Sequence, residues 1–335
     1  AAAVHGAALP KISGTPPERR SRKNRKEGDC MSARFPFCPD TYKGRPALRV
    51  ETGALRALFL PEDGGKLASL TAPDGFEFLC QNPAPAYARL AYDGRYIESE
   101  CASWDDMFPT IDPYTPLTGR YAGMTLPDHG EVCRLPMTVE ELPDGVAFRA
   151  DSRLFPVSFC KEVRAEADGA LALTYTLTNR GDVAFPCLWA AHCMLRGQDD
   201  LRIRTPFPAD APVDYMFGAT PADALPLDRL TGYAPGTGAA YKYYYTQPTP
   251  AGWLTGMYTA SGHSFTLDYR ADSASAAVPY VGIWINNGAF RDYYNIALEC
   301  CTAPYDAPDK AEAHGYPASL PPHASRRFTL RVRVE

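Results

Sequence analysis

The sequence lacks the features that mark several broad classes of protein. No apolar run reaches the length of a membrane span, and the start has no charged stretch followed by a long apolar one, as a secretory signal would. No Cys-x-x-Cys spacing occurs, so a zinc site of the usual kind is not expected. The net charge of −5 gives no general indication of nucleic-acid binding. We therefore expect no nucleic-acid or membrane partner.

The ten cysteines are not arranged like a disulfide framework. Most of them lie inside apolar runs, where a thiol behaves as a small hydrophobic group; examples are Cys160, Cys187, Cys193 and Cys300. Together with the missing secretory signal, this placement predicts a reduced, cytoplasmic protein.

Residues 1–30 differ in composition from the rest of the chain. They are rich in Ala, Pro, Gly and basic residues and hold seven basic and three acidic side chains, whereas the remaining chain is acidic. With almost no large apolar side chains, this stretch cannot offset the entropy cost of ordering. We predict a disordered basic tail over residues 1–30, or translated sequence upstream of a start at Met31, followed by one domain over residues 31–335.

The body of the chain reads as many short strands. The counts of Pro (32), Gly (26) and Tyr (20) favour strands joined by ordered turns over a helical bundle. Apolar residues alternate over 171–178 and again over 328–334, and an Asp-Gly turn precedes the first of these stretches. No amphipathic helix of three turns is found, although a short helix around 306–315 would fit. We predict an all-β fold, a large antiparallel sandwich of two sheets, whose binding face is built by loops in 83–128 and 206–250.

One predicted strand ends in a carboxylate. Ile296, Ala297 and Leu298 form a short apolar run, Glu299 follows them, and aromatic residues crowd the approach. Such surroundings solvate a carboxylate poorly and raise its pKa towards that of a usable proton carrier. The alternative is that Glu299 faces solvent or accepts hydrogen bonds from the backbone.

Two histidines add to this site hypothesis. His192 is the only polar residue in an apolar run from Leu188 to Leu195, where an imidazole needs a partner and is costly to charge. It is either a core histidine bonded to a carbonyl or a functional group. His129 lies in an Asp-His-Gly-Glu turn, where Gly130 allows the backbone to turn closely. Alone, it would fit an exposed or hydrogen-bonded residue, paired with Asp128 or Glu131.

Two further segments are candidates for substrate binding. Trp104, Asp105 and Asp106 combine an indole with two carboxylates in a predicted long loop, a pairing that suits sugars. The alternatives are a calcium loop, for which the usual ligand spacing is absent, or a loop anchored in the core. The segment Tyr241–Tyr245 predicts a half-exposed aromatic strand with Lys242 as its one cation.

In their order along the chain, these segments resemble the galactose mutarotase-like (aldose 1-epimerase) superfamily. The resemblance covers nearly all of residues 46–335 and rests on five groups of segments: Pro61–Leu70, Trp104–Pro109, Pro127–Glu131, Ala190–His192, and Val281–Gly288 with Ala297–Glu299. It implies a β-supersandwich with a sugar site on one sheet face and no cofactor. We expect a small-molecule sugar as the partner and a monomer or homodimer.

The resemblance also implies a role for each site residue. Glu299 would be the general base for the anomeric hydroxyl, and His192 the general acid for the ring oxygen. His129 would stabilise developing charge, and Trp284 would form a wall of the pocket. The resulting expectation is an aldose 1-epimerase-like isomerase. Two other functions stay open: a carbohydrate-binding or sensing protein without catalysis, and a lyase or hydrolase using the same face.

Overall fold

The structure is a computed structural model that describes residues 37–218, 238–249, 252–270 and 277–335. The predicted tail at 1–30, and the start of the domain at 31, lie outside these residues. The described part contains no helix with the length and apolar character needed to cross a membrane.

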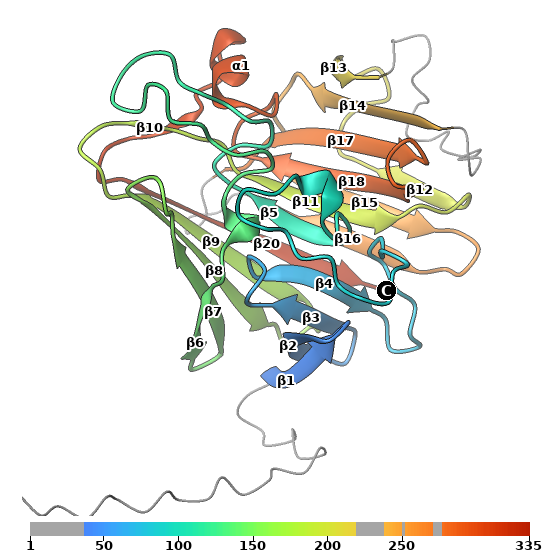
Figure 1. Cartoon of the computed structure of the whole chain (residues 1–335). Helices are drawn as coiled ribbons and strands as arrows, with labels where there is room; N and C mark the ends of the chain where they lie inside the picture. The colour runs from blue at the N-terminus through green and yellow to red at the C-terminus, as the bar shows by residue number, and fades with distance from the viewer. Residues whose placement is uncertain (1–36, 219–237, 250–251, 271–276) are drawn as a thin grey trace, which may run out of the picture.

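The described residues form two large antiparallel sheets and a two-stranded ribbon (Figure 1). The larger sheet has, in spatial order, the ten strands β1 (Phe37–Tyr42), β2 (Arg45–Glu51), β3 (Arg56–Leu60), β4 (Lys66–Thr71), β5 (Trp104–Met107), β11 (Ala190–Arg196), β18 (Tyr294–Cys301), β17 (Tyr280–Asn287), β14 (Ala239–Tyr245) and β13 (Val213–Phe217). The smaller sheet has the eight strands β12 (Leu201–Arg204), β15 (Trp253–Tyr258), β16 (Ser264–Asp268), β20 (Ser325–Val334), β9 (Leu171–Asn179), β8 (Val157–Ala165), β7 (Gly145–Asp151) and β6 (Thr138–Leu142). The ribbon pairs β10 (Phe185–Pro186) with β19 (Ser319–Leu320).

Helical structure is sparse among the described residues. It consists of α1 (Pro308–Ala313) and two single 3₁₀ turns, η1 (Tyr96–Glu98) and η2 (Val132–Arg134). The short helix expected near 306–315 is α1, and the all-β prediction is confirmed.

The alternation seen in the sequence sets the pairing in the smaller sheet. β8 and β9 form a hairpin around the turn at Gly169, whose φ of +85° suits glycine. The C-terminal strand β20 then pairs with β9, which places Leu330 opposite Leu173. The apolar faces of both strands point towards the larger sheet, as period-two alternation requires.

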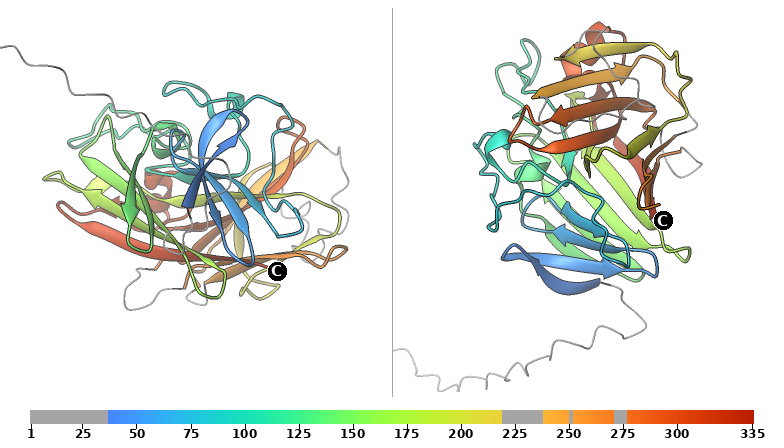
Figure 2. Two further views of the ribbon diagram at one scale, coloured as in Figure 1. Left: turned by 90° about the horizontal axis from the view of Figure 1, so that it is seen from below. Right: turned by 90° about the vertical axis from the view of Figure 1, so that its right-hand side faces the viewer.

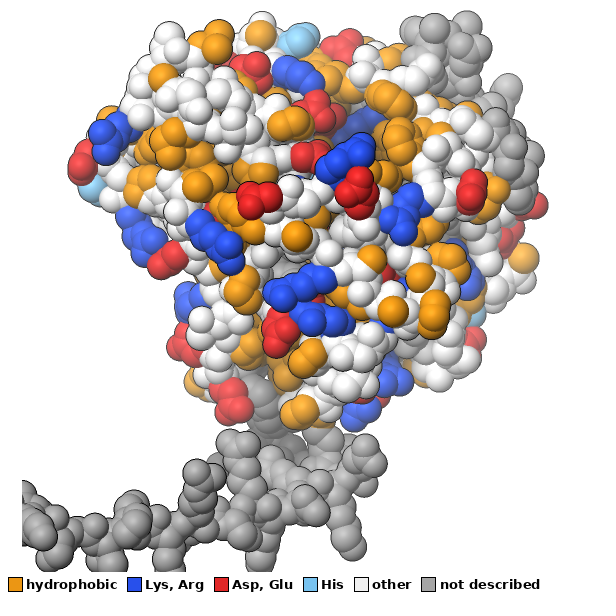
Figure 3. All heavy atoms as spheres, in the orientation of Figure 1, with side chains coloured by type: hydrophobic (Ala, Val, Ile, Leu, Met, Phe, Trp, Pro, Cys, Tyr) orange, Lys and Arg blue, Asp and Glu red, His pale blue; other side chains and the backbone are white. Residues whose placement is uncertain are grey.

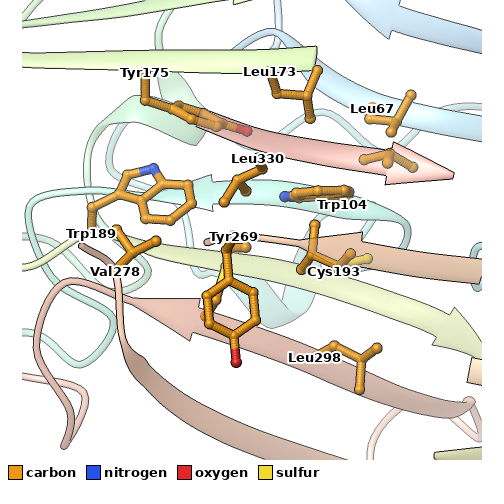
Figure 4. Close-up of a cluster of buried hydrophobic side chains, with 14 of the residues drawn as sticks. Leu67, Trp104, Leu173, Tyr175, Trp189, Cys193, Tyr269, Val278, Leu298 and Leu330 are labelled. Atoms are coloured by element: carbon orange, nitrogen blue, oxygen red, sulfur yellow. The ribbon is translucent and has the colours of Figure 1, made fainter. Parts of the chain in front are cut away.

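The hydrophobic core lies between the two sheets (Figure 4). Tyr175 and Leu330 enter it from the smaller sheet, and Trp104 and Cys193 from the larger one. Trp189 directly precedes β11, and its ring packs against Tyr175 with centroids 4.7 Å apart and planes tilted by 50°. Burial of this aromatic surface removes apolar area from water and so stabilises the packing of one sheet on the other.

Two local predictions were wrong. The segment Trp104–Met107 is a strand with all four residues buried, not a loop. Strand β14 is also buried over 241–245, not half exposed. Both are inner strands of the larger sheet, and within 83–128 the chain before and after β5 runs over the outer face of that sheet (Figure 2). Side chains on one face of these strands therefore enter the core between the sheets, and those on the other face are buried under the covering chain.

The cysteines largely follow the expectation of free thiols. Eight of those in the described residues are free, and seven of the eight are buried, whereas Cys38 is disulfide-bonded. The structure thus differs from the fully reduced chain expected from the sequence.

Candidate active site

A cavity of about 570 Å³ opens on the outer face of the larger sheet. The candidate residues His129, His192, Lys242, Trp284 and Glu299 all line it. On the face seen in Figure 3, acidic and basic side chains lie close together with hydrophobic side chains on both sides. The structure therefore brings together five residues that are far apart in the sequence.

Strand register brings the central pair together. In the pairing of β11 with β18, Cys193 lies opposite Leu298 and Ala190 opposite Cys301, so His192 lies opposite Glu299. Side chains opposite each other in an antiparallel pair share a face. His192 Nε2 lies 3.9 Å from Glu299 Oε1, too far for a hydrogen bond and close enough for both to reach neighbouring oxygens of one ligand.

A lysine two strands away in the sheet bonds to Glu299, and the strand between them carries a glycine at this point. Gly282 of β17 lies opposite both Glu299 and Tyr244. A Cβ on Gly282 would lie 2.7 Å from the Tyr244 ring, so a larger residue would displace that ring. Lys242, on the same face of β14, donates from Nζ to Glu299 Oε2 over 2.7 Å.

Glu299 is completely buried, and its two oxygens differ. Oε2 accepts the hydrogen bond from Lys242, whereas Oε1 has no hydrogen-bond partner among the residues that the structure describes. Burial raises the pKa of Glu299, Lys242 opposes that rise, and Asp306 adds to it. The result is a carboxylate with one free oxygen and a raised pKa, as proton transfer near neutral pH requires.

His192 is held as a neutral imidazole. Burial lowers its pKa well below the usual value, and the nearby His129 and Lys242 lower it further. Its Nδ1 has no hydrogen-bond partner and its Nε2 faces Glu299. The carbonyl bond expected of a core histidine is therefore absent.

His129 is fixed by its turn and by stacking. Its backbone has φ of +58°, and Gly130 packs so closely on Phe108 that a Cβ would lie 2.5 Å from the carbonyl oxygen. The ring stacks on Tyr96 with centroids 3.9 Å apart and meets the His192 ring edge-on at 5.5 Å. Its Nδ1 pairs with Asp128 at 2.7 Å, so of the two partners that the sequence left open, Asp128 and Glu131, the structure selects Asp128.

The other predicted binding residues do not line the cavity. Trp104 lies in the core between the sheets. Asp106 faces the same interior and pairs with Lys161 at 2.8 Å. Asp105 points to the cavity side but is covered, because it accepts hydrogen bonds from Lys66 and from the hydroxyl of Tyr96. Of the three, Asp105 is hydrogen-bonded to a residue that lines the cavity, Tyr96.

Among the lining residues that sequence reasoning missed, two contact the candidate groups directly. Asp306 lines the cavity and pairs with Lys242 at 2.6 Å, and Tyr96 forms the wall behind His129. Asp306 lies in an irregular turn with φ of +60°, and Tyr96 in a single 3₁₀ turn. A lone Asp or Tyr in such a segment carries no periodic signal. Within the described part of the chain, no group of three or more His, Cys, Asp or Glu is placed to hold a metal ion.

Comparison with known proteins identifies the fold. No family model and no curated protein matches the sequence. Among solved structures, a galactose mutarotase-like protein from Lactobacillus casei is 19% identical with a TM-score of 0.59, covering 86% of this chain and 100% of its own. One from Clostridium acetobutylicum is 13% identical with a TM-score of 0.61 and covers 90% and 99%. A galactose mutarotase related enzyme from Lactobacillus acidophilus is 13% identical, with a TM-score of 0.59 and coverage of 86% and 97%.

The chain therefore has the galactose mutarotase-like fold, as the resemblance predicted. At these identities the comparison establishes the architecture, and the chemistry has to be argued from the cavity itself.

The burial of His192 predicts a pH dependence of stability. Its pKa is lower in the folded state than the ordinary value of the unfolded chain, so below about pH 6.5 the unfolded state binds the extra proton. The contribution of His192 is thus fully present above that pH and is lost as the pH falls. We expect wild type to lose up to about 1.4 kcal/mol per pH unit relative to His192→Gln. Urea unfolding of both proteins between pH 8 and pH 5 measures this, and parallel curves would contradict it.

Proposed function

We propose that this protein interconverts the anomers of an aldose by acid–base ring opening, as an aldose 1-epimerase does. The observation that carries the proposal is the free oxygen of Glu299, which faces a neutral imidazole 3.9 Å away in a cavity of ligand size. Anomer exchange needs two proton-transferring groups on adjacent oxygens of one sugar, and this pair supplies them.

Each group has a definite part in the proposed reaction. Glu299 Oε1 takes the proton of the anomeric hydroxyl as the bond between C1 and the ring oxygen breaks. His192 Nε2–H gives its proton to the ring oxygen, which leaves His192 as an imidazolate until the transfers reverse. A neutral imidazole can act as an electrophile of this kind. His129, with Asp128 on its Nδ1, offers Nε2 to a neighbouring oxygen. After rotation about the C1–C2 bond, the two transfers run in reverse and close the other anomer.

The cavity walls suit a sugar. Trp284, Phe290 and Tyr293 supply aromatic surface against which C–H groups can pack. The ring centroids of Trp284 and Phe290 are 5.5 Å apart, so they form one continuous wall. On the polar side, Asp112 and Asp128 lie at the lining and can accept hydroxyl hydrogen bonds.

Exchange spectroscopy over a panel of aldoses tests the proposal. We expect catalysed anomer exchange for at least one sugar, with a rate that falls as the pH drops through the raised pKa of Glu299. The rate should not fall as the pH rises through 6.5, because His192 is already neutral. No acceleration with any sugar would contradict the proposed reaction.

One observation favours the alternative of carbohydrate binding without catalysis. The ion pair of Lys242 with Glu299 stabilises the ionised carboxylate and so opposes proton uptake. The same panel separates the two functions, since a binding protein would show saturable sugar binding with exchange at the rate of buffer.

A further inference from the structure

Three charged side chains meet at the floor of the cavity. Lys242 Nζ lies 2.7 Å from Glu299 Oε2 and 2.6 Å from Asp306 Oδ1. All three side chains are more than nine-tenths buried, and Tyr244 donates a further hydrogen bond to Asp306 over 2.6 Å. One ammonium between two carboxylates leaves the group with a single excess negative charge.

Building on the proposed function, we propose that Lys242 and Asp306 are positioning residues that act on Glu299 in opposite directions. Lys242 holds Oε2 and leaves Oε1 as the oxygen that accepts the proton. Asp306 offsets the lysine charge, so that Glu299 remains able to take up a proton while it is held in place.

The physical argument concerns the charge left behind after proton transfer. With Lys242 alone, protonation of Glu299 would leave an uncompensated buried ammonium, which is costly in a medium of low polarity. With Asp306 present, the same step leaves a neutral Lys242–Asp306 pair. The buried group then passes from one negative charge to none instead of from none to one positive charge.

Three of the four remaining titratable neighbours carry no charge that could supply this compensation. Those that face or adjoin Glu299 are His192 on β11, Tyr244 on β14, Cys301 on β18 itself and His129 from the turn before η2. Burial keeps His192 neutral and raises the pKa values of Tyr244 and Cys301 well above their usual values, so these three stay uncharged near neutral pH. The charged group that ion-pairs with Glu299 is therefore Lys242, and the charge that offsets Lys242 is that of Asp306.

Titration of the Glu299 carboxyl itself provides the test. In protein labelled with ¹³C at the Glu carboxyls and free of sugar, the Glu299 signal is assigned by its loss in Glu299→Gln. Lys242→Met should raise the midpoint by about one to three pH units, and Asp306→Asn should lower it by a similar amount, the scale of a nearby charge. Lys242→Met/Asp306→Asn should fall between the two. Shifts in one direction, or no shift, would overturn the proposal.

A matched control separates charge from stability. Lys161→Met removes an equally buried lysine from its ion pair with Asp106 between the sheets, and it should leave the Glu299 midpoint unchanged. A general loss of packing would shift the Glu299 midpoint in Lys242→Met and in Lys161→Met by similar amounts. Asp306→Asn keeps its shape, so its downward shift decides the matter if Lys242→Met does not fold.

The titration also separates this proposal from the proposed function. Opposite shifts in a protein that accelerates no anomer exchange would uphold the charge arrangement and refute the reaction. Catalysed exchange whose pH profile moves in one direction for both variants would uphold the reaction and refute the roles of Lys242 and Asp306.

Discussion

Glu299→Gln is expected to lower the rate of anomer exchange by roughly 10²–10⁴-fold while the protein stays folded. Gln has nearly the same shape and can accept a hydrogen bond from Lys242 through its amide oxygen, but it cannot take up the anomeric proton. Much of the sugar affinity should remain, because the aromatic wall is unchanged. The rate is measured by saturation-transfer NMR, beside thermal unfolding and sugar binding.

The thermal data decide between a catalytic and a structural Glu299. Replacing Glu299 removes one partner of a buried ion pair, so the unfolding temperature is expected to change. The change should be limited, because Lys242 keeps its ion pair with Asp306. A rate loss that merely tracks the fraction of unfolded protein would contradict the catalytic role, as would near-normal exchange in a stably folded variant.

Trp104→Ala is expected to cost roughly 3–5 kcal/mol of folding stability, the usual range for removing a buried aromatic side chain from a core. Only 2% of Trp104 is exposed, and its indole packs between the sheets, away from the cavity (Figure 4). Denaturant unfolding followed by circular dichroism gives the change in the free energy of unfolding.

Trp284→Ala is the matched control for this prediction. Trp284 is partly exposed and lines the cavity, so its loss should weaken sugar binding with a smaller effect on stability. If Trp104→Ala instead left stability intact and abolished sugar binding, the placement of Trp104 in the core would be contradicted.

The fold could be predicted because its signals are local and repeated. The alternation over 171–178 and 328–334 specifies which side chains face the core, and the Asp-Gly turn before β9 sets the hairpin. Two inner strands were misjudged for one physical reason. β5 and β14 are buried on both faces. In β5 this burial removes the polar alternation that identifies a strand, and in β14, which was predicted as a strand, it covers the face that was expected to be exposed.

The site was predictable where a polar residue interrupts an apolar strand. His192 and Glu299 stand out because burying such groups costs free energy, which a functional role or a bonded partner has to offset. Asp306 and Tyr96 do not, because they reach the cavity from irregular segments whose path depends on contacts distant in the sequence. Asp105 and Asp106 were predicted to bind a sugar through their carboxylates. Alternation along β5 instead directs Asp105 to Lys66 and Asp106 to Lys161.

The central claim is that Glu299 and His192 act as one acid–base pair, and a double-mutant comparison of exchange rates tests it most directly. Saturation-transfer NMR would be run on Glu299→Gln, His192→Asn and the double variant with one responsive aldose, each checked for folding. Groups that act as a unit are strongly non-additive, so the double variant should be little slower than either single variant. A double variant slowed by the product of the two single effects would show independent contributions and contradict the paired mechanism.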